Sequence, residues 1–119
     1  MTQEELIKII EQQSQIEMGI LKLKGTEYSR SGDALANFKR LSYDLDIPIE
    51  KVWCVFFMKH IDAIISFAKL GQEVSEETIM GRINDARNYL GILYAMLEDR
   101  ADVEKLEINF MKTEYKSEF

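Results

Sequence analysis

The sequence has few of the residues that interrupt helices, with one Pro and six Gly among 119 residues. No segment shows sustained alternation of apolar and polar residues, so helices are predicted and strands are not. The single cysteine, Cys54, cannot form an internal disulfide, which fits a reducing cytoplasm. No apolar run approaches the roughly 20 residues that span a bilayer, and the N-terminus lacks the basic start and apolar core of a secretion signal. We therefore expect a cytoplasmic protein that does not cross a membrane.

Positive charge is also scarce, because 15 Lys and Arg stand against 21 Asp and Glu, giving a formal net charge of −6. General binding of nucleic acid needs clustered cations, so this class is disfavoured. A local group of Lys and Arg could still bind a small anionic ligand. An acidic surface could also suit an inhibitor of a DNA-binding partner, although solubility alone explains such a charge. With 46% hydrophobic and 30% charged residues, residues 1–119 have the composition of one soluble globular domain.

Apolar residues recur three and four positions apart in four segments, which predicts an all-α fold. The predicted helices cover, in order, about residues 3–24, 34–45, 49–70 and 75–100. Their boundaries are predicted from capping and helix-breaking residues, namely Gly25, Asp33, Pro48, Gly71 and Ser75. Beyond residue 100 the pattern weakens, and residues 103–111 could form a short fifth helix. The predicted architecture is a four-helix core bundle with a short C-terminal accessory helix.

Two of the predicted helices are apolar on more than one side. In the helix over 49–70, Trp53, Phe57 and Ile61 share one broad face, while Val55 and Phe56 lie beyond it. A helix that is apolar nearly all round is usually covered on several sides. In so small a domain a second subunit would supply the extra cover, so we expect a homodimer or a higher oligomer.

The helix over 75–100 carries polar groups among its apolar residues. At about 100° per residue, Arg82, Asp85 and Tyr89 form one stripe, and Glu77, Asp85 and Asn88 belong to an adjoining one. Burying such groups costs free energy unless each has a partner. A carboxylate beside an arginine suits a Mg²⁺–phosphate site, because Mg²⁺ prefers oxygen ligands. The ordinary alternative is an Arg82–Asp85 salt bridge at a helix contact.

A second polar group lies in the helix over 49–70. Lys59 and Asp62 are neighbours on one side of this helix, whereas His60 falls at the edge of the apolar face. Lys59 or His60 could contact a phosphate or a base, and Asp62 could contact a metal or a ribose. A surface ion pair and a core-edge histidine are the ordinary alternatives.

The loop predicted over residues 25–32 could close over an anionic ligand, with Tyr28 stacking on a base, or it could be a solvated helix end. Other chemistries leave no trace in the sequence, which has neither a glycine-rich phosphate loop nor a paired Cys/His zinc spacing. Cys54 and His60 would point about 120° apart on a helix, so nucleophilic catalysis is disfavoured.

Three blocks of this sequence resemble a known family. They are Lys-Gly-Thr-Glu-Tyr with Asp-Ala-Leu-Ala-Asn-Phe (24–28 and 33–38), Val-Trp with Lys-His-Ile-Asp-Ala-Ile (52–53 and 59–64), and Gly-Arg-Ile-Asn-Asp-Ala-Arg-Asn-Tyr-Leu (81–90). Over about residues 20–98 the chain looks like the nucleotide-modification-associated domain family common in phage genomes, which is similar to all-α nucleotide pyrophosphohydrolases of the MazG type. The resemblance implies an oligomeric helical bundle that binds a nucleoside phosphate and could cleave it to a monophosphate and pyrophosphate with Mg²⁺.

The resemblance also implies roles for individual residues. The carboxylates Asp62, Glu77 and Asp85 would act as catalytic metal ligands. The other nucleotide-binding residues would contact phosphate, base or sugar: Lys24, Tyr28, Asn37, Lys59, His60, Arg82, Asn88 and Tyr89. The family's paired Glu-x-x-Glu and Glu-x-x-Asp ligands would correspond here to Lys59-x-x-Asp62 and Asp85-x-x-Asn88, which retain half the carboxylates. We therefore expect nucleotide binding first and hydrolysis second. The alternative is a non-catalytic protein that sequesters a nucleotide signal or inhibits a host defence protein.

Overall fold

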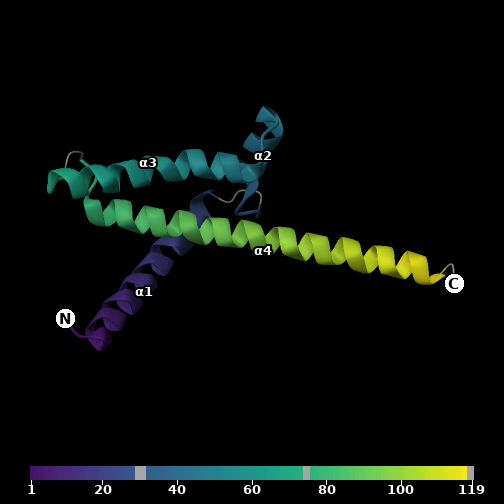
Figure 1. Ribbon diagram of the computed structural model, residues 1–119, viewed down its shortest axis with the longest axis horizontal. Coiled ribbons are helices and arrows are strands. Elements are labelled where there is room, and N and C mark those ends of the chain that lie inside the picture. Colours follow the sequence, from purple (N-terminus) through teal and green to yellow (C-terminus); the bar gives the residue numbers. More distant parts are fainter. Residues whose placement is uncertain (29–31, 74–75, 118–119) are drawn as a thin grey trace.

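The computed structural model consists of four helices, α1 (Gln3–Tyr28), α2 (Ala36–Leu45), α3 (Ile49–Leu70) and α4 (Ile79–Ser117) (Figure 1). It describes the backbone of residues 1–28, 32–73 and 76–117; the side chains of 25–28, 102–107, 109–110 and 112–117 also lie outside the description. Within these ranges every regular element is a helix, so the predicted all-α class is confirmed. None of the described helices combines the length and apolarity that a bilayer crossing demands.

Short-range capping contacts mark the start of α1 and the end of α3. At the start of α1, Thr2 and Glu5 exchange two hydrogen bonds, because the Glu5 N–H donates to Thr2 Oγ1 at 3.1 Å and the Thr2 N–H donates to Glu5 Oε2 at 2.8 Å. This reciprocal pair is a capping box. At the end of α3, Gly71 adopts φ 69° and its N–H donates to the Phe67 carbonyl at 2.8 Å. A left-handed residue is most easily supplied by glycine, so the predicted stop at Gly71 is confirmed.

Two other predicted boundaries were wrong. α1 continues through Gly25 to Tyr28, because one glycine costs only about 1 kcal/mol in a helix interior. α4 continues without a break to Ser117, so residues 103–111 are part of α4 and form no separate fifth helix. Residues 101–117 contain neither Gly nor Pro, so nothing in the local sequence ends the helix there. The predicted cap at Ser75 lies outside the described residues, and α4 begins at Ile79 with Thr78 Oγ1 accepting the Gly81 N–H at 3.1 Å.

The helices are arranged around the antiparallel pair formed by α3 and α4, which lie side by side (Figure 1). α2 packs against α3, and α1 crosses α4. Among the side chains that the structure describes, the buried hydrophobic residues lie on α3 and α4, and they are Val52, Trp53, Ala86 and Met96. The Trp53 indole N–H donates to the Tyr89 carbonyl at 2.6 Å, which ties the two helices together across their contact.

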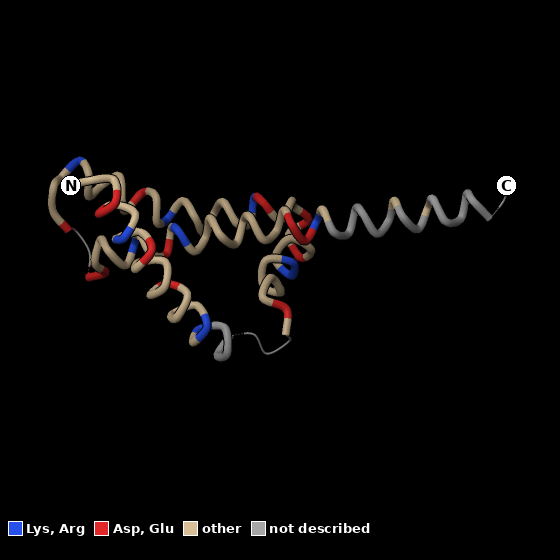
Figure 2. The backbone as a smooth tube through the Cα atoms, turned by 90° about the horizontal axis from the view of Figure 1, so that it is seen from below, with Lys and Arg blue, Asp and Glu red and all other residues tan. Residues whose placement is uncertain are grey.

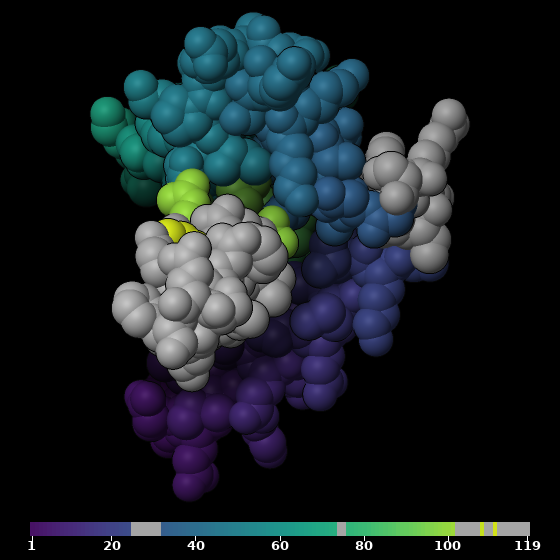
Figure 3. Space-filling model, turned by 90° about the vertical axis from the view of Figure 1, so that its right-hand side faces the viewer, coloured from purple at the N-terminus to yellow at the C-terminus, as the bar shows by residue number. Residues whose placement is uncertain are grey.

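The molecule is elongated, with principal extents of 67 × 39 × 29 Å. In the space-filling view, α1 stands out as a ridge below α2 and α3 (Figure 3). Acidic and basic residues are interspersed along the described helices, and neither sign is gathered on one of them (Figure 2). The fold thus offers a small α3–α4 core with the other two helices attached to its sides.

Candidate functional site

Five of the predicted site residues meet at the contact between α3 and the start of α4, and we call them the polar cluster: His60, Glu77, Arg82, Asp85 and Tyr89. His60 is buried, with 8% of its surface exposed. Its Nδ1 lies 3.5 Å from Arg82 Nη1 and 3.8 Å from Asp85 Oδ2. The other terminal nitrogen of Arg82, Nη2, lies 3.2 Å from Glu77 Oε2. The stripe of Arg82, Asp85 and Tyr89 expected from the sequence therefore faces His60.

The ring nitrogen Nδ1 of His60 lies near both a hydrogen-bond donor, Arg82, and a hydrogen-bond acceptor, Asp85. Arg82 can only donate a hydrogen bond, and an ionised Asp85 can only accept one. A ring without a proton on Nδ1 can accept the 3.5 Å hydrogen bond from Arg82, whereas Asp85 Oδ2 lies 3.8 Å away, which is within ion-pair range but too long for a hydrogen bond. His60 thus lies beside a cation and a carboxylate on the same side of its ring.

Arg82 is the most constrained cation of the cluster. Its side chain is only 13% exposed, and its buried Nε has no hydrogen-bond partner in the described part of the chain. A buried donor without a partner costs about 1–3 kcal/mol. Guanidinium groups present their N–H donors as a planar fork that suits phosphate and carboxylate oxygens. Glu77 supplies one such carboxylate at the N-terminal end of α4, where negative charge is favourable.

Tyr89 forms the aromatic wall of the cluster. Its ring lies 5.1 Å from the His60 ring and 6.4 Å from the Phe38 ring, measured between centroids. Burial raises the pKa of the Tyr89 hydroxyl above its usual value, and the nearby Asp85 carboxylate raises it further. Tyr89 is therefore neutral over the ordinary pH range and can act as a hydrogen-bond donor.

The remaining predicted site residues lie elsewhere on the chain. Lys59 and Asp62 are exposed on α3, and Asp62 lies about 160° round that helix from His60. Lys24 and Asn37 are exposed, whereas Asn88 is half-buried on α4. The Tyr28 side chain lies outside the described residues.

The three carboxylates proposed as magnesium ligands do not form one set of ligands within a protomer. Among the residues that the structure describes, no three His, Cys, Asp or Glu side chains come close enough to share a metal ion. Glu77 pairs with Arg82, Asp85 faces His60 and Asp62 is exposed. The described residues of the chain therefore do not fit a Mg²⁺ site made of protein oxygens alone.

A second polar group, which the sequence did not predict, joins α4 to α1. Arg87 Nη1 donates to Gln13 Oε1 at 2.7 Å, and Nη2 donates to Ser14 Oγ at 3.0 Å. Arg87 Nε lies 3.2 Å from Glu17 Oε2, and Gln13 Nε2 donates to Asn84 Oδ1 at 3.1 Å. The signal that could have revealed this contact is the interruption of the apolar face of α1 by three polar residues at its middle.

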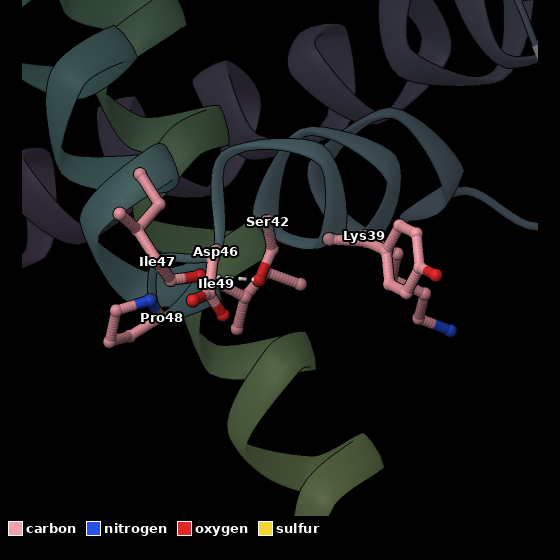
Figure 4. Close-up of a pocket in the computed structure, with 7 residues that line it drawn as sticks. Lys39, Ser42, Asp46, Ile47, Pro48 and Ile49 are labelled. Atoms are coloured by element: carbon pink, nitrogen blue, oxygen red, sulfur yellow. Dashed lines mark hydrogen bonds between the residues drawn. The ribbon is translucent and has the colours of Figure 1, made fainter.

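A separate hollow opens at the turn between α2 and α3, away from the predicted site residues (Figure 4). Its lining comes from the end of α2 and the start of α3, and consists of Lys39, Ser42, Tyr43, Asp46, Ile47, Pro48 and Ile49. Ser42 Oγ donates to the Ile47 carbonyl at 2.6 Å, which closes the turn. Lys39 is already paired with Asp33 at 2.8 Å, and this hydrogen bond lowers the pKa of the Asp33 carboxyl and raises the pKa of the Lys39 ammonium. The hollow therefore offers no strong anion-binding group.

Comparison with known proteins adds no relative, since no protein-family model, no curated protein and no solved structure matches the chain. The resemblance to the phage nucleotide-modification family therefore stays a hypothesis.

Proposed function

We propose that this protein binds a small phosphorylated nucleotide at the polar cluster between α3 and α4. The observation that carries the proposal is the state of Arg82: nearly buried, held by His60 on one side and Glu77 on the other, with its Nε donor unused. A phosphate that replaced the Glu77 carboxylate would meet a guanidinium already fixed in place. Such preorganisation favours binding, because little side-chain freedom is lost when the ligand arrives.

The neighbouring residues suit the other parts of a nucleotide. Tyr89 and His60 supply aromatic rings at the cluster, whereas Lys59 is exposed elsewhere on α3, so its assignment as a second cation rests on the family resemblance. Aromatic rings stack on bases, and cations neutralise phosphates. The assignments of Lys24, Tyr28, Asn37 and Asn88 rest on the family resemblance alone.

Hydrolysis of the nucleotide with Mg²⁺ is the second stage of the hypothesis. Mg²⁺ is commonly bound through one or two carboxylates together with substrate phosphates. Asp85, and Glu77 if it leaves Arg82, would be the carboxylates of this protomer nearest a bound phosphate; the exposed Asp62 would need a rearrangement or a second copy. A bound Mg²⁺ would supply charge neutralisation at the phosphates.

The test is a thermal-shift panel of nucleoside mono-, di- and triphosphates with and without Mg²⁺, on the unchanged protein and two variants. Arg82→Gln removes the proposed phosphate ligand. Arg87→Gln removes the same charge from the same helix at the α1 contact, so it is the matched control. A ligand at 100 times its Kd stabilises a protein by about 2.7 kcal/mol, which is about 10 °C for a domain of this size.

We expect one or more nucleotides to raise the melting temperature of the unchanged protein and of Arg87→Gln, but not of Arg82→Gln, each measured against its own ligand-free value. Release of pyrophosphate that requires Mg²⁺ and is abolished by Asp85→Ala would establish hydrolysis as well. A panel without any shift in the correctly folded protein, or an equal shift in Arg82→Gln, would refute the proposed site.

The second candidate is a non-catalytic binding protein that sequesters a nucleotide signal or inhibits a host defence protein. The observation in its favour is the outward side of α3, where Val55, Met58 and Ile65 are exposed. A nucleotide that binds without turnover and without Mg²⁺ supports the sequestering form. A complex with a purified host protein that survives Arg82→Gln and is broken by Val55→Glu supports the inhibitor. A complex that both substitutions break, or that neither substitution breaks, counts against it.

A further inference from the structure

The apolar face of α1 is covered by its own chain only at its middle. Gln13 and Glu17 lie at the crossing with α4, where they contact Asn84 and Arg87. The apolar residues on the same face before and after the crossing are all exposed, and they are Leu6, Ile10, Ile20 and Leu21. Figure 1 shows the reason, since α1 crosses α4 instead of running along it. Both ends of this face therefore need a cover that one chain does not provide.

The part of α4 at the crossing has the same kind of face. Ile83, Arg87, Leu90, Tyr94 and Leu97 are spaced four, three, four and three residues apart. On α1, the series Leu6, Ile10, Gln13, Glu17 and Ile20 has the same spacing. This alternation places residues in one line along a helix and is typical of helices that pack lengthwise against a partner. We call the two lines together the α1–α4 seam.

Within one chain, much of the seam is open to water. Leu90, Tyr94 and Leu97 are 50%, 69% and 49% exposed, and Leu6 and Ile10 are 40% and 44% exposed. The charged and amide groups at the crossing, by contrast, are already paired within the chain, although Glu17 Oε1 accepts no hydrogen bond from the residues that the structure describes. The surface of the seam that a partner could cover is therefore apolar, and it lies on both sides of a polar centre whose groups are already paired.

The accessible surface of the chain can be compared with that of a compact monomer of the same mass. The chain exposes 9841 Å² for a mass of 13.9 kDa, whereas a compact monomer of this mass exposes about 6,700 Å². Its radius of gyration is 19.3 Å, against about 13.5 Å for a compact domain of this length. Obligate homodimers bury roughly 2,000–5,000 Å² in total. One chain thus exposes more surface than a compact monomer of its mass, which leaves area available for such an interface.

We propose that the α1–α4 seam packs against the seam of a second copy of this chain. A two-fold interface uses the same surface on both copies and must be complementary to itself. The seam meets this condition, because it offers two apolar lines of equal spacing and no uncompensated charge at its centre. A membrane surface is a poorer occupant, since a chain of net charge −6 is repelled by anionic lipid. This inference does not depend on nucleotide binding.

The experiment measures the oligomeric state of the full chain by sedimentation equilibrium and by size-exclusion chromatography with light scattering. Ile10→Glu and Leu97→Glu place a charge on each line of the seam. Val55→Glu is the matched control, because Val55 is 70% exposed on the outward side of α3. We expect the unchanged protein and Val55→Glu to be dimers, and each seam variant to raise the dissociation constant at least about 100-fold, since each substitution acts twice in a symmetric dimer.

Several results would overturn the proposal. One is a monomeric unchanged protein; another is a seam variant that stays as tightly associated as the control; a third is dissociation by Val55→Glu alone, which would move the interface to α3. If a charged variant loses helical circular dichroism, the milder Tyr94→Ser decides by the same criterion. Arg82→Gln should remain a dimer, so loss of nucleotide binding and loss of association can be told apart.

Discussion

Arg87 is the residue on which the attachment of α1 depends, and its removal gives the sharpest test of the fold. It contributes two hydrogen bonds, to Gln13 and Ser14, and an ion pair with Glu17. The Glu17 side chain is only 18% exposed, and its Oε1 has no hydrogen-bond partner among the residues that the structure describes. Arg87→Leu would thus leave a nearly buried carboxylate without its cation.

The expected cost follows from this geometry. Deleting one partner of a charged hydrogen bond costs about 1.5–3 kcal/mol, and breaking a fully buried ion pair costs about 3–5 kcal/mol. Arg87 is one-third exposed, so water replaces part of what is lost, and we expect about 2–4 kcal/mol. For 119 residues, this lowers the melting temperature by about 8–16 °C.

The assay is urea unfolding followed by circular dichroism, together with a thermal melt. The double variant Arg87→Leu/Glu17→Leu should recover at least about half of the loss, because replacing both partners by apolar groups is often nearly neutral. Arg40→Leu, which removes an exposed cation from α2, should change stability by less than about 0.5 kcal/mol. Two results would show that Arg87 does not stabilise the α1–α4 contact. One is a loss of similar size in Arg40→Leu. The other is a double variant whose loss equals the sum of the losses in Arg87→Leu and Glu17→Leu measured separately.

Two further predictions concern pH and helix interiors. Because burial and Asp85 raise the pKa of Tyr89, its contribution to stability is complete below the unfolded-state pKa of about 10 and is lost as pH rises through the folded-state value. Urea unfolding at a series of alkaline pH values should therefore show a steeper loss in the unchanged protein than in Tyr89→Phe, and parallel curves would contradict the assignment. Gly19→Ala should stabilise α1 by about 0.5–1 kcal/mol, since nothing lies within 4 Å of the added carbon. Gly81→Ala should gain less, because the new carbon would lie 3.2 Å from Thr78 Oγ1, the atom that caps α4; an equal gain in both would argue against the cap.

Both boundaries of α3 were predicted correctly, whereas Gly25 did not end α1. Pro48 and Gly71 bracket α3 as expected, because each imposes a backbone geometry that is local to the sequence. The end of α4 could not be placed in the same way. Residues 101–117 have a weak apolar pattern but contain no helix breaker. A weak apolar pattern indicates that the helix is little buried, and it does not indicate where the helix ends.

In the candidate site, too, the features within one helix could be predicted, and the contacts between helices could not. Helical spacing alone puts Arg82, Asp85 and Tyr89 on one side of α4, and this was predicted. That His60 faces them depends on how α3 and α4 are rotated against each other, which spacing within one helix does not determine. The contact of Arg87 with Gln13 joins positions 74 residues apart. Its only trace in the sequence is a polar gap in an apolar face, which does not identify the partner.

The only tryptophan and the only cysteine of the chain are adjacent on α3 and face different surroundings. Trp53 is buried against α4, with its indole on the Tyr89 carbonyl and its ring stacked 4.6 Å from Phe57, whereas the Cys54 thiol is exposed. The natural sequence therefore already contains a fluorophore that reports on the α3–α4 contact. It also contains one accessible point for a maleimide dye, so separation of these two helices can be followed by emission without engineering a probe into the protein.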